Sequence, residues 1–226
     1  YHNSPVSAVS PFTQNLEHDT SVGQFKVLIE DEKGCARYSG LVIEGVTVKE
    51  SPTWLKNRLQ SIGVRSINNI VDITNYILHE TGQPLHAFDA SEIKENKVVV
   101  KKYAAGTKFT TLDGVERSLQ ANDLMITDGV KPMCIAGVFG GLQSGVKAST
   151  KNIFLESAWF ENVHIRKTSV HHGLRTDAAT RFEKGVDIAN TVKVLEKAAA
   201  MIQEIAGGKC SQVVDVYPNP AEKVKV

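Results

Sequence analysis

The chain has 226 residues, of which 42% are hydrophobic, and its formal net charge at pH 7 is +1. This length and composition are enough for a globular protein with a sizeable core that needs no disulfide framework. The near-neutral charge excludes the basic excess of a general nucleic-acid-binding domain, so any contact with a nucleic acid must be local or supplied elsewhere.

The two ends of the chain differ in composition from the segment between them. Residues 1–23 are rich in Ser, Asn, Thr and Pro without a sustained period, and residues 218–226 begin with Pro-Asn-Pro. We expect a lead-in or linker first, one domain over residues 24–217, and then an exit linker towards a next domain. Because the chain begins with Tyr1 rather than Met, we expect it to be a piece of a longer protein.

The first part of the domain predicts two strands followed by a helix. Strands are expected at 24–30 and 36–48, where β-branched residues are frequent and Gly34 supplies a turn. A helix then begins at Ser51-Pro52, with Ser51 as its cap, and ends at Gly63.

A second helix is predicted from residue 66 to residue 81. Its apolar side chains form one broad stripe, which is typical of a largely buried helix. Thr74 is the one hydroxyl on that stripe, whose other members are Ile67, Val71 and Leu78. The helix ends at Gly82, and His86 follows at the start of the next element.

The middle of the chain is rich in predicted strands, at 97–103, 109–112, 115–119, 124–127, 132–139 and 153–157. Asp113-Gly114 is a typical hairpin turn. The last part predicts helices at 161–172, 176–184 and 187–206 and a closing strand at 211–217. The whole pattern predicts a mixed α/β (α+β) fold, a single domain with a β-rich middle and flanking helices.

Two residues are candidates for chemistry on their own merits. An isolated histidine such as His86 is more often a surface residue, but helix exits aim side chains, so a base or hydrogen-bonding role stays open. Glu156 lies in an apolar strand, where a carboxylate either reaches solvent at an edge or is held for a purpose.

Other polar residues favour structural or solvated roles. His79-Glu80 and His171-His172 lack the spacing of zinc sites, so we expect solvated histidines and no metal. Cys134 lies in an apolar strand, which is typical of an inert thiol. The three cysteines are far apart and odd in number, which suits a reducing compartment. No segment has the length of a membrane span or the pattern of a signal peptide, so we expect a cytoplasmic protein.

Six motifs together resemble the B3/4 region of the bacterial phenylalanyl-tRNA synthetase β subunit. They appear in the family's order and span residues 24–217, nearly the whole chain. They are Val-Asp-Ile-Thr-Asn-Tyr (71–76), Gly-Gln-Pro-Leu-His-Ala-Phe-Asp (82–89), Thr-Leu-Asp-Gly-Val-Glu-Arg (111–117), Ile-Ala-Gly-Val-Phe-Gly-Gly (135–141), His-Gly-Leu-Arg-Thr-Asp-Ala (172–178) and Arg-Phe-Glu-Lys-Gly-Val-Asp (181–187).

The resemblance implies a three-layer β/β/α domain that hydrolyses the ester of tyrosine mistakenly attached to the phenylalanine tRNA, with water as the nucleophile. A pocket for a hydrophobic side chain rejects an added hydroxyl by only roughly 10²-fold, so a second site that binds the hydroxyl is needed. The implied partners are the synthetase α subunit, in a heterotetramer of two α and two β subunits, the remaining β-subunit domains, and the 3′ end of the tRNA. No cofactor is implied in this domain, because ATP and Mg are expected only for aminoacylation in the other subunit.

The resemblance also implies roles for single residues. His86 matches the histidine that lies at the ester, Thr74 matches a pocket threonine, and Glu156 matches the glutamate that receives the tyrosine hydroxyl. The glycine-rich wall and the small lining residues of the pocket are matched by Ala136, Gly137, Gly140, Thr176 and Ala178.

Two other functions stay open from the sequence. One is a non-catalytic module that positions tRNA within the synthetase, which the basic residues between 164 and 184 favour. The other is a stand-alone trans-editing protein, which the linker-like ends disfavour. The sequence decides neither whether the isolated chain is active nor whether His86 removes a proton or only orients water.

Overall fold

A computed structural model describes residues 10, 12 and 16–220 of the chain. Most of the expected lead-in and most of the expected exit linker lie outside the described residues. Within the lead-in, His18 forms a bridge with Cys210, and Val22 is buried in the core. The described end of this segment therefore packs against the domain.

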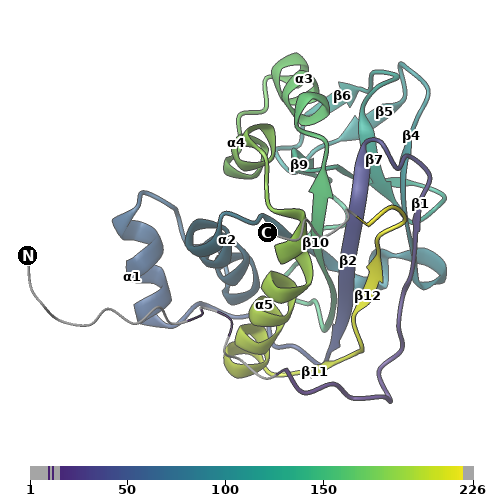
Figure 1. The fold of residues 1–226 in the computed structure, drawn as a ribbon. Helices are drawn as coiled ribbons and strands as arrows, with labels where there is room; N and C mark the ends of the chain where they lie inside the picture. Colours follow the sequence, from purple (N-terminus) through teal and green to yellow (C-terminus); the bar gives the residue numbers. More distant parts are fainter. Residues whose placement is uncertain (1–9, 11, 13–15, 221–226) are drawn as a thin grey trace, which may run out of the picture.

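Two β-sheets and a layer of helices make up the domain (Figure 1). The first sheet has the order β1-β4-β7-β8-β9, with strands Lys26–Ile29, Lys97–Lys102, Leu124–Thr127, Pro132–Ile135 and Phe139–Gly140. The second has the order β11-β2-β10-β3, with strands Lys209–Cys210, Cys35–Glu44, Asn152–Phe160 and Leu85–Asp89. In addition, β12 (Val214–Val216) pairs with β2, and β5 (Lys108–Thr110) pairs with β6 (Glu116–Ser118) as the predicted hairpin.

Five α-helices complete the described chain. They are α1 (Thr53–Ser61), α2 (Asn69–Thr81), α3 (Asn162–His172), α4 (Asp177–Lys184) and α5 (Thr191–Ala206). Short 3₁₀ turns occupy Ala90–Glu92, Lys94–Asn96 and Ile188–Asn190. Helices α2 and α5 lie on the outer face of the second sheet, α1 packs on the far side of α2, and α3 and α4 lie near the far end of β10 (Figure 1).

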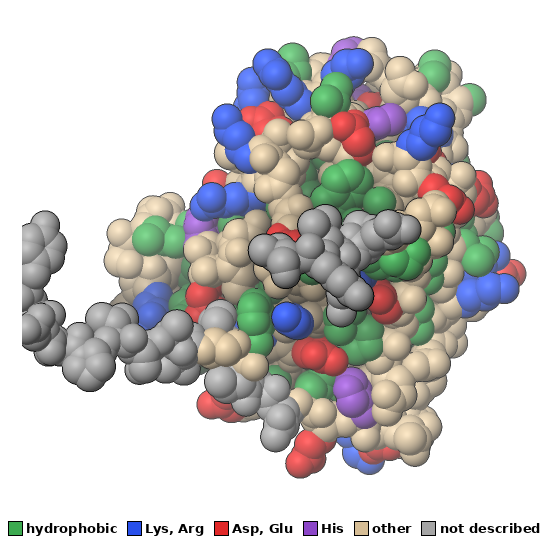
Figure 2. Space-filling view, viewed as in Figure 1, with side chains coloured by type: hydrophobic (Ala, Val, Ile, Leu, Met, Phe, Trp, Pro, Cys, Tyr) green, Lys and Arg blue, Asp and Glu red, His purple; other side chains and the backbone are tan. Residues whose placement is uncertain are grey.

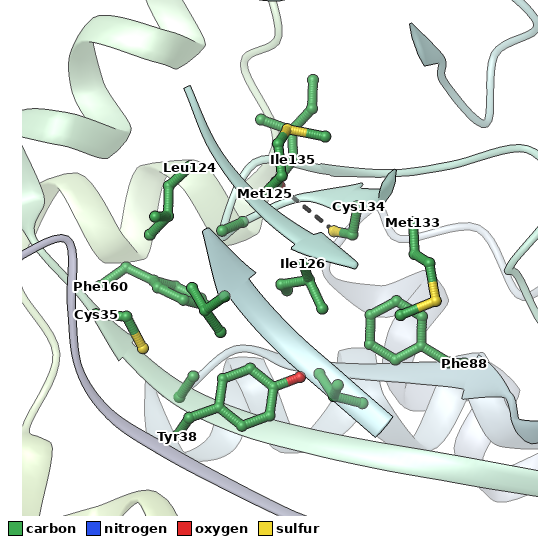
Figure 3. Packing of buried hydrophobic residues seen from close by; sticks show 14 of the residues in the cluster. Cys35, Tyr38, Phe88, Leu124, Met125, Ile126, Met133, Cys134, Ile135 and Phe160 are labelled. Atoms are coloured by element: carbon green, nitrogen blue, oxygen red, sulfur yellow. Dashed lines mark hydrogen bonds between the residues drawn. The ribbon is translucent and has the colours of Figure 1, made fainter. Parts of the chain in front are cut away.

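The central strand β10 is buried on both of its faces, which explains the three layers. Successive side chains of a strand point to opposite faces. Phe154 and Phe160 of β10 belong to the core between the two sheets, whereas Ile153 and Leu155 belong to the core between the second sheet and the helices. Figure 3 shows part of the first core, including Tyr38 and Phe88. The expected three-layer β/β/α fold is confirmed.

Helix α2 begins later than the sequence predicts. The Asn68 side chain caps it, accepting hydrogen bonds from the amides of Ile70 and Val71 at 3.1 and 3.0 Å. Ile67 therefore precedes the helix and is 65% exposed, so its assignment to the buried stripe is wrong. The predicted end is confirmed, because Gly82 adopts the left-handed conformation with φ = 78°.

The predicted cap of α1 is also wrong. Pro52 occupies the cap position, and no side chain bonds to the first turn of that helix. The Ser51 hydroxyl instead donates to the buried carboxylate of Asp72 at 2.6 Å, and Ser66 donates to the same oxygen at 2.5 Å. Asp72 thus ties the segment before α2 to the start of α1, a contact between distant residues that local cap rules do not include.

One predicted strand is two. Instead of one strand at 132–139, β8 and β9 form a tight hairpin through residues 136–138, with Gly137 at φ = 66°. Only glycine adopts this conformation without strain. The turn brings backbone close to β3, and it builds one wall of the site described below.

We expect Gly40→Ala to destabilise the fold by about 1–3 kcal/mol, the usual cost of overpacking a core. Gly40 pairs with Glu156, and a Cβ at Gly40 would lie 2.3 Å from Cζ of Phe154. Urea unfolding of the chain measures the change. Gly23→Ala is the matched control, because a Cβ there meets nothing within 4 Å. Equal unfolding free energies for the two variants would contradict the packing described.

Candidate functional site

A cavity of about 570 Å³ opens beside the edge strand β3. Its walls come from α2, β3, β10, the β8–β9 hairpin and the start of α4. Most of the residues singled out from the sequence line it, namely Thr74, His86, Gly137, Gly140, Glu156, Thr176 and Ala178. Ala136 is buried next to the cavity but does not line it.

A wider depression of about 730 Å³ lies beside α1. None of its lining residues is buried, and none of the predicted site residues reaches it. Binding sites for small ligands combine enclosed apolar walls with a few convergent polar groups. The cavity beside β3 has this character, so we take it as the candidate site.

His86 lies on β3 directly opposite Glu156 of β10 in the antiparallel register, so both side chains project from the same face of the sheet. The imidazole contacts the ring of Phe88 edge to face, with 4.4 Å between centroids. Its Nε2 atom is buried and has no hydrogen-bond partner among the described residues. Burial lowers the pKa of His86 to about 4. The imidazole is therefore neutral at pH 7, with hydrogen-bonding capacity left for a ligand or water.

Glu156 is only 5% exposed and lies on an inner strand, so the solvated-edge alternative does not hold. The Tyr38 hydroxyl donates to its Oε2 atom at 2.8 Å. Burial raises the pKa of Glu156 to about 8, against a smaller lowering by the hydrogen bond from Tyr38. The carboxyl group is therefore neutral at pH 7.

Glycines let the backbone of the β8–β9 hairpin approach the site closely. A Cβ at Gly140 would lie 3.0 Å from Cε1 of His86 and 2.8 Å from Cδ1 of Leu112. A Cβ at Gly137 would contact the rings of Phe160 and Phe182 at 2.9 Å. Side chains at these two positions would displace the groups around the cavity, so the wall depends on glycine.

The hydroxyl groups of Thr74 and Thr176 both donate hydrogen bonds to backbone carbonyls. Thr74 donates to the Val71 carbonyl at 2.7 Å, within α2. Thr176 caps α4 by accepting from the Ala179 amide at 3.0 Å, and it donates to the Val138 carbonyl at 2.9 Å. Thr176 therefore fastens the start of α4, and with it Ala178, to the β8–β9 hairpin.

Comparison with known proteins shows the family of the chain. The sequence model of the B3/4 domain family matches residues 34–207. The chain belongs to the B3/4 domain family. The resemblance stated from the sequence motifs is thereby confirmed.

Relatives of this B3/4 domain include proteins named phenylalanine–tRNA ligase beta subunit. The one from Porphyromonas gingivalis is 56% identical over 207 residues, which is 91% of this chain and 25% of the relative. The one from Bacteroides fragilis is 53% identical over 206 residues, with the same coverage of each chain. The chain thus spans about a quarter of the length of these relatives.

A solved structure shares the fold. It is an N-terminal fragment of the phenylalanyl-tRNA synthetase β-subunit from Pyrococcus horikoshii, with a TM-score of 0.54 and 13% sequence identity. The match covers 89% of this chain and 56% of that fragment. At this identity the likeness shows the fold alone.

The sequence reasoning missed two residues that line the B3/4 cavity and Tyr38, which is fully buried and contacts the lining residue Glu156. Tyr38 contacts Glu156 across 118 residues of sequence, and a tyrosine in an apolar strand carries no signal of such a contact. Arg175 and Asp177 line the cavity at the start of α4, within a motif already quoted for the resemblance. Their motif was the available signal, although it did not distinguish lining residues from their neighbours.

Cys134 lines the cavity without the setting of a nucleophile. Its thiol is within 3.4 Å of the Phe139 carbonyl, and burial raises its pKa well above the ordinary value. A thiol held in its protonated form is a weak nucleophile, which agrees with the inert role expected from the sequence.

One expected solvated histidine is buried instead. The His172 side chain is 4% exposed, and its Nε2 atom lies 2.6 Å from Oδ2 of Asp123. Asp123 also accepts a hydrogen bond from the Thr168 hydroxyl at 2.9 Å, so this pair anchors α3 to the segment before β7. Among the residues that the structure describes, no three His, Cys, Asp or Glu side chains form a group that could hold a metal. In the same part of the chain, no helix is both long and apolar enough to cross a membrane.

We expect the free energy of unfolding of the wild-type chain to fall as the pH rises from 5.5 to 7.5. The fall should be about 2–3 kcal/mol larger than the fall in the Glu156→Gln variant over the same range. The pKa of Glu156 is about 8 in the folded state and 4.5 in its ordinary setting. A raised folded pKa contributes stability that is complete below pH 4.5 and is lost, by about 1.4 kcal/mol per pH unit, as pH rises towards 8. Urea unfolding of both proteins across this range measures the difference, and parallel curves would show that Glu156 titrates normally.

Proposed function

We propose that this B3/4 domain is the editing module of a phenylalanyl-tRNA ligase β subunit and hydrolyses tyrosine from mischarged phenylalanine tRNA. The observation that carries the proposal is the pairing of His86 and Glu156. They are cross-strand neighbours, both neutral at pH 7, in a cavity of the size that binds small ligands. The chain is 56% identical to a phenylalanine–tRNA ligase beta subunit over 91% of its own length, and this similarity supports the same function.

Glu156 is the proposed receptor for the tyrosine hydroxyl. A tyrosyl group would enter between α2 and the β8–β9 hairpin with its ring among apolar side chains such as Leu78, Val138 and Phe139. A buried carboxyl that forms a hydrogen bond with the ligand is stabilised, whereas a phenylalanyl group would leave it without that partner. Such a site discriminates far more strongly than a pocket that recognises apolar shape alone.

His86 is the proposed holder of the attacking water. A pKa near 4 makes its imidazole neutral but weakly basic, which favours orienting water over removing a proton completely. The water oxygen attacks the ester carbonyl carbon and loses one proton, the bond to the ribose oxygen breaks, and the ribose oxygen takes up that proton, so that free tyrosine and a ribose hydroxyl result. The backbone of Gly140 lies against the imidazole, and both line the cavity, so the ester would sit beside these two groups.

The remaining parts of the proposal concern partners. Arg175 is the one Lys or Arg among the described residues that line the cavity, and its exposed side chain suits a phosphate of the tRNA 3′ end. With a net charge of +1, the chain leaves most of the tRNA affinity to the α subunit and the other β-subunit domains. Its three free, buried cysteines support a cytoplasmic location. We expect hydrolysis to require no cofactor in this domain, with ATP and Mg used only for aminoacylation in the other subunit.

A second candidate is a module that only positions tRNA. Lys and Arg side chains gather over α3 and α4 at the top of the molecule in Figure 2. The exposed members are Arg166, Lys167, Arg175, Arg181 and Lys184. A surface of this kind binds phosphates without chemistry, and it is separate from the pairing of His86 and Glu156.

We expect His86→Ala to lower kcat/KM for deacylation of Tyr-tRNA by about 10²-fold or more, because a positioned water-binding group is lost. The assay uses the full-length β subunit that contains this chain, assembled with its α subunit. His164→Ala is the control, since His164 lies on α3 away from the cavity. Loss of deacylation with unchanged tRNA affinity supports the enzyme, and a normal rate of deacylation contradicts the role of His86.

We expect Ala178→Trp to abolish deacylation while phenylalanylation continues, because an indole at the start of α4 would fill the cavity. Ala105→Trp is the matched control, since Ala105 is exposed on the loop before β5. Both activities are measured on the same assembled enzyme. Deacylation at the normal rate by the Ala178 variant would place the substrate elsewhere.

A further inference from the structure

The carboxyl group of Glu156, the proposed receptor for the tyrosine hydroxyl, is hydrogen-bonded to a fully buried side chain. Tyr38 on β2 is 0% exposed, and its hydroxyl donates to Oε2 of Glu156 at 2.8 Å. The Tyr38 ring stacks on Phe154, with 6.5 Å between centroids, and Phe154 stacks on Phe25 at 5.4 Å. Figure 3 shows Tyr38 within the packed core between the sheets. A ring fixed on such a stack holds its hydroxyl at one place.

The two oxygens of Glu156 are therefore not equivalent. Oε2 accepts from Tyr38, whereas Oε1 has no hydrogen-bond partner among the described residues, and Glu156 lines the cavity. A neutral carboxyl has one oxygen that carries the proton and one that only accepts. Because Tyr38 donates to Oε2, the proton of a neutral Glu156 belongs on Oε1. Burial of the carboxyl, which raises its pKa to about 8, agrees with the neutral form.

We propose that Tyr38 is a positioning residue that makes Glu156 present a single hydrogen-bond donor, Oε1–H, to the para-hydroxyl of a tyrosyl substrate. The inference rests on the proposed function and adds the polarity of the contact. The ligand oxygen accepts the hydrogen bond, whereas an ionised Glu156 would itself accept a hydrogen bond from the phenol hydroxyl. Without Tyr38, either carboxyl oxygen can carry the proton, and the carboxyl can turn away from the ligand.

Substitutions of the two partners distinguish these cases. In Tyr38→Phe the ring stays and only the hydroxyl is lost. In Glu156→Gln the amide oxygen can accept from Tyr38 while the amide NH₂ replaces Oε1–H as the donor. Glu156→Ala removes both contacts. Tyr103→Phe is the matched control, because its hydroxyl also makes one hydrogen bond, at 2.9 Å to the Thr127 hydroxyl, and Tyr103 does not line the cavity.

The experiment measures kcat/KM for deacylation of Tyr-tRNA and Phe-tRNA by the assembled full-length enzyme. We expect Tyr38→Phe to lower the Tyr-to-Phe ratio by about 10-fold, the equivalent of one hydrogen bond, mainly through a higher KM for Tyr-tRNA. Glu156→Gln should stay within about threefold of the wild-type ratio, and Glu156→Ala should lose discrimination. The double variant Tyr38→Phe, Glu156→Gln should have a lower Tyr-to-Phe ratio than Glu156→Gln alone. Tyr103→Phe should match the wild type.

Two results would overturn the inference. They are a wild-type ratio in Tyr38→Phe, or a loss in Glu156→Gln as large as in Glu156→Ala. Thermal unfolding shows whether each variant folds. If either Tyr38→Phe or Glu156→Gln fails to fold, the result for the other variant tests the inference. If the wild-type enzyme hydrolyses the ester of neither Tyr-tRNA nor Phe-tRNA, the proposed function is wrong. Binding of 3′-tyrosylamino-adenosine against its phenylalanyl counterpart, by wild type and Tyr38→Phe, then tests Tyr38 separately, and equal preference in the two proteins would overturn its role.

Discussion

A carboxyl group buried in the central strand of the domain is the constraint on which the site depends. β10 is covered by a second sheet on one face and by helices on the other, so Glu156 lies where most side chains are apolar. A charged carboxylate at such a place is costly, and the group keeps its proton instead. A ligand can reach it from the cavity, which Glu156 lines, and Tyr38 decides which oxygen faces that ligand.

The same architecture positions His86. As the last strand of its sheet, β3 pairs with β10 on one side, and its other side forms an isolated bridge from Phe88 to Gly145 and borders the cavity. The antiparallel register places His86 opposite Glu156, and Gly140 lets the β8–β9 hairpin approach the imidazole. Strands and a helix end hold these groups more rigidly than loops would. The flanking helices α2 and α5 are themselves joined by an ion pair of Lys197 with Glu80 at 2.5 Å.

The sequence predicted the local elements better than their contacts. The strand at 124–127 and the hairpin at Asp113-Gly114 followed from composition and turn chemistry alone. The division of 132–139 into two strands did not, because an apolar run containing glycine does not reveal where it turns. The motif at 82–89 contains His86, and Glu156 was singled out from its apolar strand, but nothing indicated Tyr38, whose role arises only when β2 pairs with β10. His172 was missed for the same reason, since its partner Asp123 is distant in sequence.

The uncharged state of His86 and Glu156 also affects how the product would leave the cavity. His86 and Glu156 are shifted in opposite directions from their ordinary pKa values, and both shifts leave the group uncharged at pH 7. The ester group carries no charge, so it can enter such an interior without an ionic partner. On the proposed function, hydrolysis converts that ester into a carboxylate, which meets no cation inside the described cavity apart from Arg175. An uncompensated charge is disfavoured in apolar surroundings, so the chemical step itself would weaken the binding of the released amino acid.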